Sequence, residues 1–362
     1  MSTPSLGRQP VGVRTYPLNC WYVAARSDQI SYSLTPLRVA GKSLVFARAR
    51  DGSAAALEDR GAHRPHPLSL GRLEHDRIIS GLDGWVYTFD GQCVHVPSQT
   101  LIPVDAQVRV YPTIDDGVFV WVWPGESSLA ERRRPPALGW LMDPGWANGG
   151  GEVVVAANYL FLLEMFADVT HVPFVDPFVA PPVLSSAPTP PLEVEVSETS
   201  VSFIRRYPEA KLPEWHSAAI GLQPDRVCPH RELGTLASPS VWTDDWEAQD
   251  DDARHSLRFV QAVTPIDERT TRLSWRVSRN FNLTDAATTE SLTAAFAGYY
   301  PRVGAACEAM QHSVDTDGPG IEVDVSADVA ALHVRRILRA LVNEESGRPV
   351  RKRLRERHAV TH

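Results

Sequence analysis

The sequence lacks long hydrophobic runs, is poor in cysteine and carries no excess of positive charge. No segment of its 362 residues approaches the roughly 20 consecutive apolar residues of a membrane-spanning helix, so we expect no membrane insertion. The first residues, MSTPSLGRQPVGVR, contain no apolar core of the kind that a signal peptide needs, which predicts a cytoplasmic protein. The four cysteines are then expected to be reduced thiols.

The formal net charge of -8 disfavours a nucleic-acid-binding surface, because such a surface needs a basic face that displaces counterions from phosphates. One basic run departs from this balance: the segment 348–357, RPVRKRLRER, holds six basic residues. It is either an interaction tail or a solvated chain end, and its terminal position favours the solvated end.

What is present is an ordinary globular composition, with 43% hydrophobic and 22% charged residues, in a chain too long for one compact core. We therefore predict an α+β protein with two domains. The expected divisions are an N-terminal extension (1–15), a β domain (16–125), a connection (126–151), a second domain (152–343) and a basic tail (344–362). Two Cys-x-His pairs, Cys93/His95 and Cys228/His230, fall in different domains, which favours burial over a shared metal site.

Turn residues and hydrophobic periodicity support this division. Residues 16–123 alternate short apolar runs with Gly, Asp and Pro turns, as in DDGVFVWVWPG, which indicates antiparallel strands. Later in the chain, apolar spacing predicts a helix over 158–169 and another after Ser326, an N-cap candidate. The stretch 256–278 is strand-like. The proline-dense segment 173–191 is expected to be neither helix nor central strand, and therefore to cover other elements.

The longest motif is LEDRGAHRPHPLSLGRLEHDRIISGLDGWVYTFDG, residues 57–91. It resembles the cluster-binding segment of Rieske-type non-haem iron oxygenases, in which Cys-x-His is followed after about 15 to 17 residues by Cys-x-x-His. The resemblance places Gly61, His63, Ser80 and Asp83 at the four ligand positions, with 16 residues between His63 and Ser80. Because both thiolate positions lack sulfur, and glycine offers no ligand atom, we expect no iron–sulfur cluster.

A second segment, NYLFLLEMFADVTHVPFVDP, resembles the metal-binding helix of the same family and the residues after it. The family pattern there is Asp-x-x-His-x-x-x-x-His, which supplies a bridging carboxylate and two ligands of a mononuclear iron. This chain has Asp168, His171 and Asp176 at those positions. Either the three side chains hold a divalent cation, or Asp168 and His171, three apart on one helical face, bond each other. The second arrangement is favoured, and it would raise the pKa of the imidazole and provide an acid or base.

The third iron ligand of the family is a carboxylate on a late helix. In AGYYPRVGAACEAMQ the resemblance places it at about Val303, and valine cannot coordinate iron. Asp315 or Asp317 could still approach from further along the chain. With no complete ligand set at either site, we expect a protein without a metal or other cofactor.

The resemblance extends from YPLNCWY, which begins at Tyr16, to the terminal helix SADVAALHVRRILRALVNEE, and is greatest to the vanillate-demethylase-type, single-subunit oxygenases. It implies an N-terminal Rieske-like β domain and a C-terminal helix-grip (START-like) domain, in which an antiparallel sheet curves around a long helix. A substrate chamber is expected between sheet and helix. Candidate substrate-binding residues are Tyr159, Phe161, Met165, Phe174, Arg205, Trp215, Phe259 and Trp275.

These features predict a metal-independent, non-redox enzyme with His171, Asp168 and Asp176 as catalytic candidates. A cyclase fits, for example one for a [4+2] cycloaddition of an apolar polyketide-like intermediate in natural-product or antibiotic biosynthesis, because such a reaction needs only positioning and water exclusion. Two alternatives stay open: a non-catalytic ligand-binding or regulatory protein, and a residual oxygenase. The expected partner is an apolar small molecule. Related oxygenases often form head-to-tail trimers, which leaves a homo-oligomer open.

Overall fold

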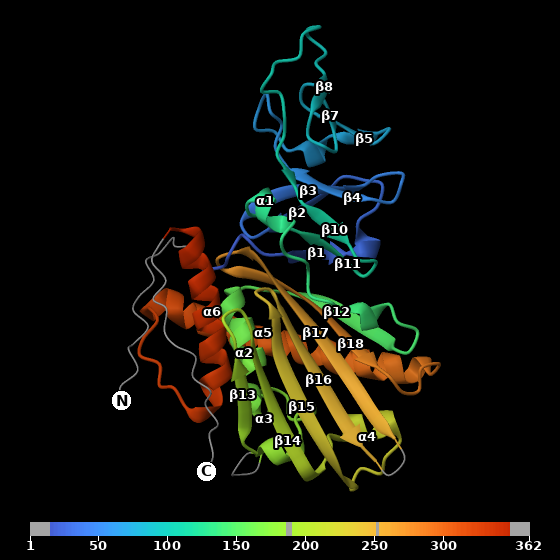
Figure 1. Cartoon of the computed structure of the whole chain (residues 1–362), viewed down its shortest axis with the longest axis vertical. Helices are drawn as coiled ribbons and strands as arrows, with labels where there is room; N and C mark the ends of the chain where they lie inside the picture. Colours follow the sequence, from blue (N-terminus) through green and yellow to red (C-terminus); the bar gives the residue numbers. More distant parts are fainter. Residues whose placement is uncertain (1–14, 186–189, 251–252, 348–362) are drawn as a thin grey trace. The chain divides into compact units, whose positions relative to one another are not determined.

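The computed structural model describes residues 15–185, 190–250 and 253–347, so the basic run 348–357 and most of the N-terminal extension lie outside it. The described residues divide into two compact units: Leu18–Pro135, and the described residues from 136 to 347 together with 15–17. Small sheets build the first unit, and one large sheet with helices builds the second (Figure 1). The fold class is therefore α+β. No helix in the described part of the chain is long and apolar enough to cross a membrane.

The unit Leu18–Pro135 consists of three antiparallel sheets of short strands, because turn residues interrupt the apolar runs every few positions. One such turn, between β7 and β8, holds Gly91 at φ 82°, a conformation that glycine adopts without strain. The sheets, in hydrogen-bonded order, are β1 (Tyr22–Arg26), β11 (Phe119–Val122) and β10 (Thr113–Asp115); β2 (Thr35–Val39), β3 (Lys42–Arg48), β4 (Ala54–Glu58) and β9 (Val110–Tyr111); and β5 (Arg72–Glu74), β6 (Arg77–Ile79), β7 (Val86–Thr88) and β8 (Cys93–His95).

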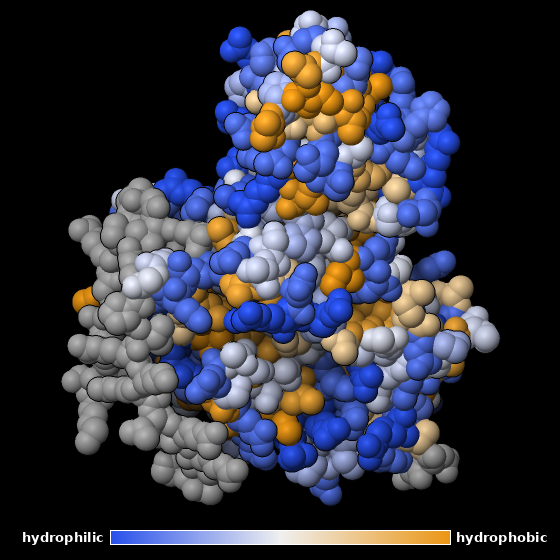
Figure 2. Space-filling view, turned by 45° about the horizontal axis from the view of Figure 1, so that its top comes forward, coloured by the Kyte–Doolittle hydropathy of each residue, from blue (hydrophilic) through white to orange (hydrophobic). Residues whose placement is uncertain are grey.

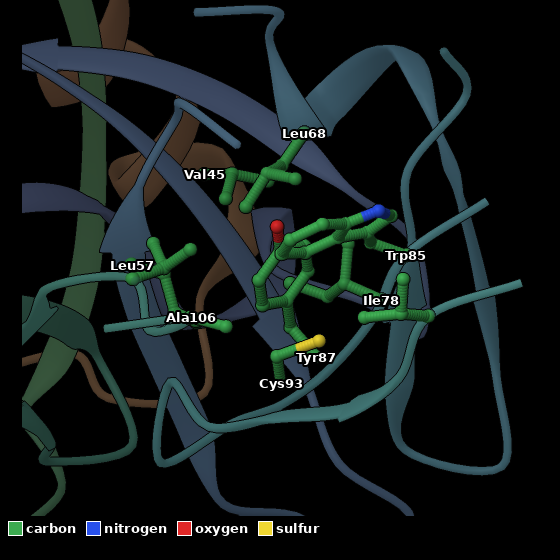
Figure 3. Close-up of a cluster of buried hydrophobic side chains, with 10 residues drawn as sticks. Val45, Leu57, Leu68, Ile78, Trp85, Tyr87, Cys93 and Ala106 are labelled. Atoms are coloured by element: carbon green, nitrogen blue, oxygen red, sulfur yellow. The ribbon is translucent and has the colours of Figure 1, made fainter. Parts of the chain in front are cut away.

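A hydrophobic cluster fills this unit beneath the loops of the Rieske-like motif. The rings of Trp85 and Tyr87 lie among aliphatic side chains that include Leu57, Leu68 and Ile78 (Figure 3). Other apolar residues stay at the surface, where Figure 2 shows hydrophobic groups gathered on one face of the unit. The buried cluster is thus packed by apolar side chains.

The second unit is built on one seven-stranded antiparallel sheet. Burial alternates along its strands; in β15, for example, Glu232, Gly234 and Leu236 face the interior while Leu233 and Thr235 are less buried. The strand order is β12 (Ala147–Val155), β18 (Thr270–Arg279), β17 (Arg254–Asp267), β16 (Val241–Gln249), β15 (Val227–Ser238), β14 (Val201–Lys211) and β13 (Leu192–Val196).

Helices cover the inner face of this sheet. The longest helix, α5 (Ala286–Asp317), lies across the strands (Figure 1). Its Phe296 ring packs on Phe259 with 4.7 Å between centroids, and its Tyr300 ring packs on Trp275 with 5.0 Å between centroids. Its N-cap is Asp285, whose carboxylate accepts the backbone N–H of Ala287. The helices are α1 (Ser127–Ala130) in the first unit, and α2 (Tyr159–Ala167), α3 (Val172–Val175), α4 (Glu214–Ile220), α5 (Ala286–Asp317) and α6 (Val329–Glu345) in the second.

Three local expectations need correction. Ser326 begins a 3₁₀ turn rather than the terminal helix, and α6 starts at Val329 with Asp328 as N-cap. The proline-dense segment contains the short helix α3, because Pro173 sits in its first turn, where no intrahelical N–H is needed. The expected connection 126–151 contains the boundary between the units, but its last residues, from Ala147, already belong to β12.

Candidate functional site

The loops of the Rieske-like motif bring the four ligand positions into one region of the first unit. The Nδ1 atom of His63 lies 3.1 Å from Oδ2 of Asp83, and its ring stacks on Trp85 at 5.1 Å between centroids. His63, the one nitrogen ligand among the four positions, thus contacts the carboxylate of Asp83, which stands at the position of the second histidine. His63 and Asp83 therefore contact each other, and they do not form the pair of histidines that would bind one iron of the cluster.

The two thiolate positions contain no ligand atom that an iron–sulfur cluster requires. Gly61 has no side chain, and a Cβ built there would lie 3.1 Å from the carbonyl oxygen of Arg64, which is a tight contact. Ser80 is buried, and its hydroxyl is not a substitute for a thiolate. The chemistry of this donor set therefore does not fit a [2Fe–2S] cluster.

The second predicted site begins where α2 ends. The Asp168 carboxylate accepts the N–H and the hydroxyl of Thr170, at 3.0 and 2.8 Å, and so caps the following turn. The Nδ1 atom of His171 lies 2.7 Å from the backbone oxygen of Asp168; because a carbonyl can only accept, this nitrogen donates. The expected carboxylate–imidazole bond is therefore wrong. The Asp168 carboxylate is used by Thr170.

The other side of His171 faces a phenol. Its Nε2 atom lies 3.3 Å from the Tyr299 hydroxyl, and since Nδ1 carries the proton, Nε2 accepts the hydrogen bond. Burial lowers the pKa of His171 although the nearby Asp168 acts to raise it, which corrects the predicted increase. The imidazole is therefore neutral near pH 7.

Asp176 does not join this pair. It is 2% exposed, its Oδ2 atom is 2.8 Å from Nη1 of Arg302, and its Oδ1 atom accepts the N–H of Phe178. Val303, at the third ligand position, is fully buried on α5, while Asp315 pairs with Arg269 at 3.1 Å. Among residues 15–185, 190–250 and 253–347, no group of three His, Cys, Asp or Glu side chains is arranged to hold a metal ion. The donor set does not fit a mononuclear iron either.

A chamber lies between the sheet and α5 in the second unit. Its volume is about 40 Å³ on the measure by which one water needs roughly 10–15 Å³, and it is partly open to solvent. Of the eight predicted substrate-binding residues, Met165 and Phe259 line it. Aromatic side chains of α5 and polar side chains of the sheet complete the wall, among them Phe296, Tyr299, Tyr300, Glu232, Asp244 and Gln261.

The remaining aromatic candidates stand behind or outside this wall. Trp215 packs on Phe296 at 5.3 Å, and Trp275 on Tyr300, so both support the lining from behind. Tyr159 is fully buried and Phe161 partly buried, and neither reaches the chamber.

Phe174 is 87% exposed, and its prediction as a lining residue is wrong. The side chain follows Pro173 in the short helix α3, and it is the buried neighbours Val172 and Pro173 that face the protein.

Four polar residues cross the inner face of the sheet. Only Arg205 among them was predicted from the sequence, as a substrate-binding residue, and it does not line the chamber. Arg205 on β14 lies opposite Glu232 on β15 in the strand register. Asp244 on β16 is the diagonal neighbour of Glu232, since it pairs with Gly234. Gln261 on β17 is likewise diagonal to Asp244. We refer to Arg205, Glu232, Asp244 and Gln261 as the polar row.

Hydrogen bonds connect the polar row to the chamber. The Gln261 amide donates to Oδ2 of Asp244 at 2.9 Å and to the Tyr300 hydroxyl at 3.1 Å. Trp242 Nε1 donates to Oδ1 of Asp244 at 2.9 Å. Although these donors act to lower it, enclosure by protein raises the pKa of Asp244 to about 8. At neutral pH this carboxyl is therefore mostly protonated and can donate a hydrogen bond into the chamber.

Glu232 is enclosed in the same way. It is 4% exposed, accepts a hydrogen bond from the Tyr207 hydroxyl at 3.2 Å, and lies 3.7 Å from Nη1 of Arg205. Burial raises the pKa of Glu232, while Arg205 and Tyr207 act to lower it. The sequence contains one signal for this residue: Glu232 lies an even number of positions from Cys228, Gly234 and Leu236, and residues at even spacing in a strand share a face, which here is the buried one.

Comparison with known proteins identifies the family. Residues 20–112 match the Rieske [2Fe-2S] domain, and residues 155–344, just over half of the chain, match the vanillate O-demethylase oxygenase C-terminal domain. The chain belongs to the Rieske oxygenase family. This Rieske oxygenase family member keeps both domains of its relatives and has, at the ligand positions of the first, a glycine, a serine and an aspartate.

Relatives of known name support the assignment along most of the chain. The vanillate O-demethylase oxygenase subunit of Pseudomonas sp. is 26% identical over 291 residues, covering 76% of this chain and 81% of that protein. The iron-sulfur subunit of the toluene-4-sulfonate monooxygenase system of Comamonas testosteroni is 25% identical over 340 residues, covering 91% and 98%. The crystal structure of dicamba monooxygenase bound to 3,6-dichlorosalicylic acid has the same fold, with a TM-score of 0.85 at 24% identity over 91% of this chain and 98% of that one.

Proposed function

We propose that this member of the Rieske oxygenase family is a metal-independent, non-redox enzyme that closes a ring in an apolar, polyketide-like molecule. The observation that carries the proposal is the donor set at the cluster positions, where Gly61 and Ser80 stand in place of both thiolates. Without the cluster there is no route for electrons to an iron, and the positions around His171 do not assemble an iron ligand set. The fold that remains is a scaffold around a chamber.

The chamber suits a reaction in which the substrate supplies all the atoms. In a [4+2] cycloaddition two σ bonds form at the expense of two π bonds, and no oxidant, reductant or leaving group is needed. An enclosed wall of Met165, Phe259, Phe296 and Tyr300 can hold the reacting ends of one chain together and exclude water, which removes several kcal/mol from the barrier. The protonated carboxyl of Asp244 can polarise a carbonyl of the substrate by a hydrogen bond.

The polar row also favours an uncharged substrate over an anion. Vanillate and toluene-4-sulfonate, which occur in the names of two relatives, are anions. An anion in this chamber would lie beside Glu232 and Asp244 without a cationic side chain among the described lining residues, so its burial would not be compensated. A neutral carbonyl or hydroxyl can instead take the hydrogen bond that Asp244 offers. The substrate we propose is therefore apolar and uncharged.

The test uses purified full-length protein, treated with a chelator and kept anaerobic, together with a linear polyene that carries a carbonyl group. The expected product has the mass of the substrate and a different chromatographic retention. Heat-denatured protein is the control for spontaneous cyclisation. A product that has gained oxygen or lost a methyl group, or turnover that requires added iron and a reductant, would overturn the proposal in favour of a residual oxygenase.

A pair of variants distinguishes a cyclase from a protein that only binds its ligand. Asp244→Asn removes the acidic proton inside the chamber, and the neighbouring Asp245→Asn changes a carboxyl that pairs with Arg258 at 3.0 Å instead. A cyclase that uses Asp244 should lose at least about tenfold in turnover in the first variant only. Binding of the polyene without any change in its retention would identify a ligand-binding protein, and the enzyme proposal would fail.

A further inference from the structure

A second cavity adjoins the chamber. Its lining includes polar and aromatic side chains, while most of its accessible surface is apolar. Its volume is about 10 Å³, close to the roughly 10–15 Å³ that one water needs on the same measure, and it shares Pro181, Glu232 and Trp246 with the chamber. His216 on α4 and His230 on β15 line it together with Tyr207. The chamber and this cavity therefore meet at Glu232 and Trp246, so one ligand could extend from the first into the second.

The imidazole of His216 has no hydrogen-bond partner on either ring nitrogen within the described residues. The side chain is 2% exposed and stacks on Trp215, with 5.1 Å between ring centroids. Enclosure lowers the pKa of His216 to about 3, so the ring is neutral at ordinary pH and carries one N–H donor and one bare nitrogen. A buried donor and acceptor that are both unsatisfied are costly, and such atoms commonly mark a binding site.

His230 contributes an acceptor whose tautomer the structure fixes. Its Nδ1 atom lies 3.1 Å from the backbone oxygen of Cys228, and because a carbonyl only accepts, Nδ1 carries the proton. Nε2 is therefore a bare acceptor, and it is buried without a hydrogen-bond partner in the part of the chain that the structure describes. The ring is held in place by stacking on Tyr207 at 4.5 Å.

A donor stands across the same cavity. Trp246 Nε1 is buried and makes no hydrogen bond to any of the residues 15–185, 190–250 and 253–347. Its ring lies 6.4 Å from that of His216, between centroids. Two residues that line the cavity therefore carry a buried polar atom without a partner among the described residues, an acceptor on His230 and a donor on Trp246. A hydroxyl group can donate to the first and accept from the second, whereas a methyl ether or a carboxylate can only accept.

We propose that this second cavity is a polar subsite that binds an uncharged O–H group, an enol, phenol or alcohol, of the ligand whose apolar part occupies the chamber. The O–H donates to Nε2 of His230, and Trp246 Nε1 or His216 donates to its oxygen. This assignment rests on the proposed function for the apolar substrate class, and it adds which polar group that substrate carries and where it lies. The proposal concerns binding alone and does not require the protein to convert its ligand.

The test measures binding to the full-length, metal-free protein by calorimetry with three probes of similar shape: 1-naphthol, 1-methoxynaphthalene and 1-naphthoate. We expect 1-naphthol to bind about tenfold more tightly than the ether, which corresponds to about one hydrogen bond, and naphthoate to bind more weakly than naphthol. His230→Phe and His216→Phe keep an aromatic ring and should abolish the preference for naphthol. His255→Phe is the matched control, because His255 bonds Asp250 at 3.1 Å and lines neither cavity.

A second measurement needs no variant. In the ¹⁵N spectrum of histidine-labelled protein, His230 should show a protonated Nδ1 and a bare Nε2, and naphthol but not its ether should shift the Nε2 resonance. Equal affinities for naphthol and ether, no detectable naphthol binding, or a preference that survives in both histidine variants would overturn the subsite. Since these readouts involve no product, they can succeed or fail independently of the cyclisation assay.

Discussion

Replacing Asp244 with asparagine removes a chamber carboxyl whose titration falls in an accessible pH range. Its pKa is about 8 in the folded protein and 3.8 as an ordinary aspartate. Between these values the folded state binds more protons than the unfolded chain, so the free energy of unfolding falls as the pH rises through 8. With about 1.4 kcal/mol per pKa unit, the Asp244 contribution should fall by about 1.4 kcal/mol between pH 7 and pH 9.

The asparagine variant keeps the shape of the carboxyl without the titration. Its amide oxygen can accept from Trp242 Nε1. Its amide N–H takes the place of the oxygen to which Gln261 donates, so the Gln261 amide must flip and accept this N–H through its own oxygen, which has no partner among the described residues. Relative to the parent, Asp244→Asn should therefore gain about 1.4 kcal/mol of stability between pH 7 and pH 9.

Urea unfolding of both proteins at pH 7, 8 and 9 measures this difference. Asp225→Asn is the control, because Asp225 is exposed, pairs with Lys211 at 2.6 Å, and has a lowered pKa, so its titration is complete well below pH 7. If parent and Asp244→Asn change in parallel over this range, Asp244 is already ionised at pH 7 and cannot donate a hydrogen bond into the chamber.

Two further predictions concern the scaffold around the chamber. Arg335→Met should cost about 3 kcal/mol of stability in urea unfolding, because Glu164, 2.7 Å away and 13% exposed, would remain buried without its partner. The double variant with Glu164→Met should recover most of that loss; a single variant as stable as the parent would contradict the reasoning. Gly234→Ala should cost about 2 kcal/mol, since its Cβ would lie 2.5 Å from the Phe203 ring. Gly139→Ala, with no atom within 4 Å, should match the parent, and equal thermal midpoints for both variants would show that the Phe203 ring can move.

The architecture was readable from the sequence because a long motif fixes its own register. The spacing from His63 to Ser80 and the Gly and Asp turns around them identified the Rieske-like unit, and the match to that domain confirms it. The absence of cluster ligands followed from residue identity alone, since a glycine has no ligand atom in any conformation. Helix α2 was also predicted to within two residues, because its apolar spacing agrees with an Asn158 N-cap.

The interior of the second unit was harder to predict because it depends on which strands become neighbours. Arg205, Glu232, Asp244 and Gln261 lie on four strands and are distant in sequence, and they form a row only through the register of the sheet. The local pattern also gave a wrong prediction at Phe174. This large apolar residue follows the buried Val172 and Pro173, yet its own side chain is exposed to solvent.

The contact made by His171 shows the same limit at shorter range. Its spacing from Asp168 correctly suggested proximity, but the spacing could not distinguish the carboxylate of Asp168 from its backbone oxygen. A choice between side-chain and backbone partners depends on how the helix ends, and α2 ends at this aspartate.

Iron and acid-labile sulfide content tests the central claim most directly. Full-length protein is purified without oxygen from iron-replete cells, beside the iron-sulfur subunit of the toluene-4-sulfonate monooxygenase system as a positive control, and both are analysed for metal, sulfide and visible absorption. With Gly61 and Ser80 at the thiolate positions, we predict a colourless protein with no iron or sulfide above background. Two irons and two sulfides per chain, with the absorption of a [2Fe–2S] cluster, would contradict the account.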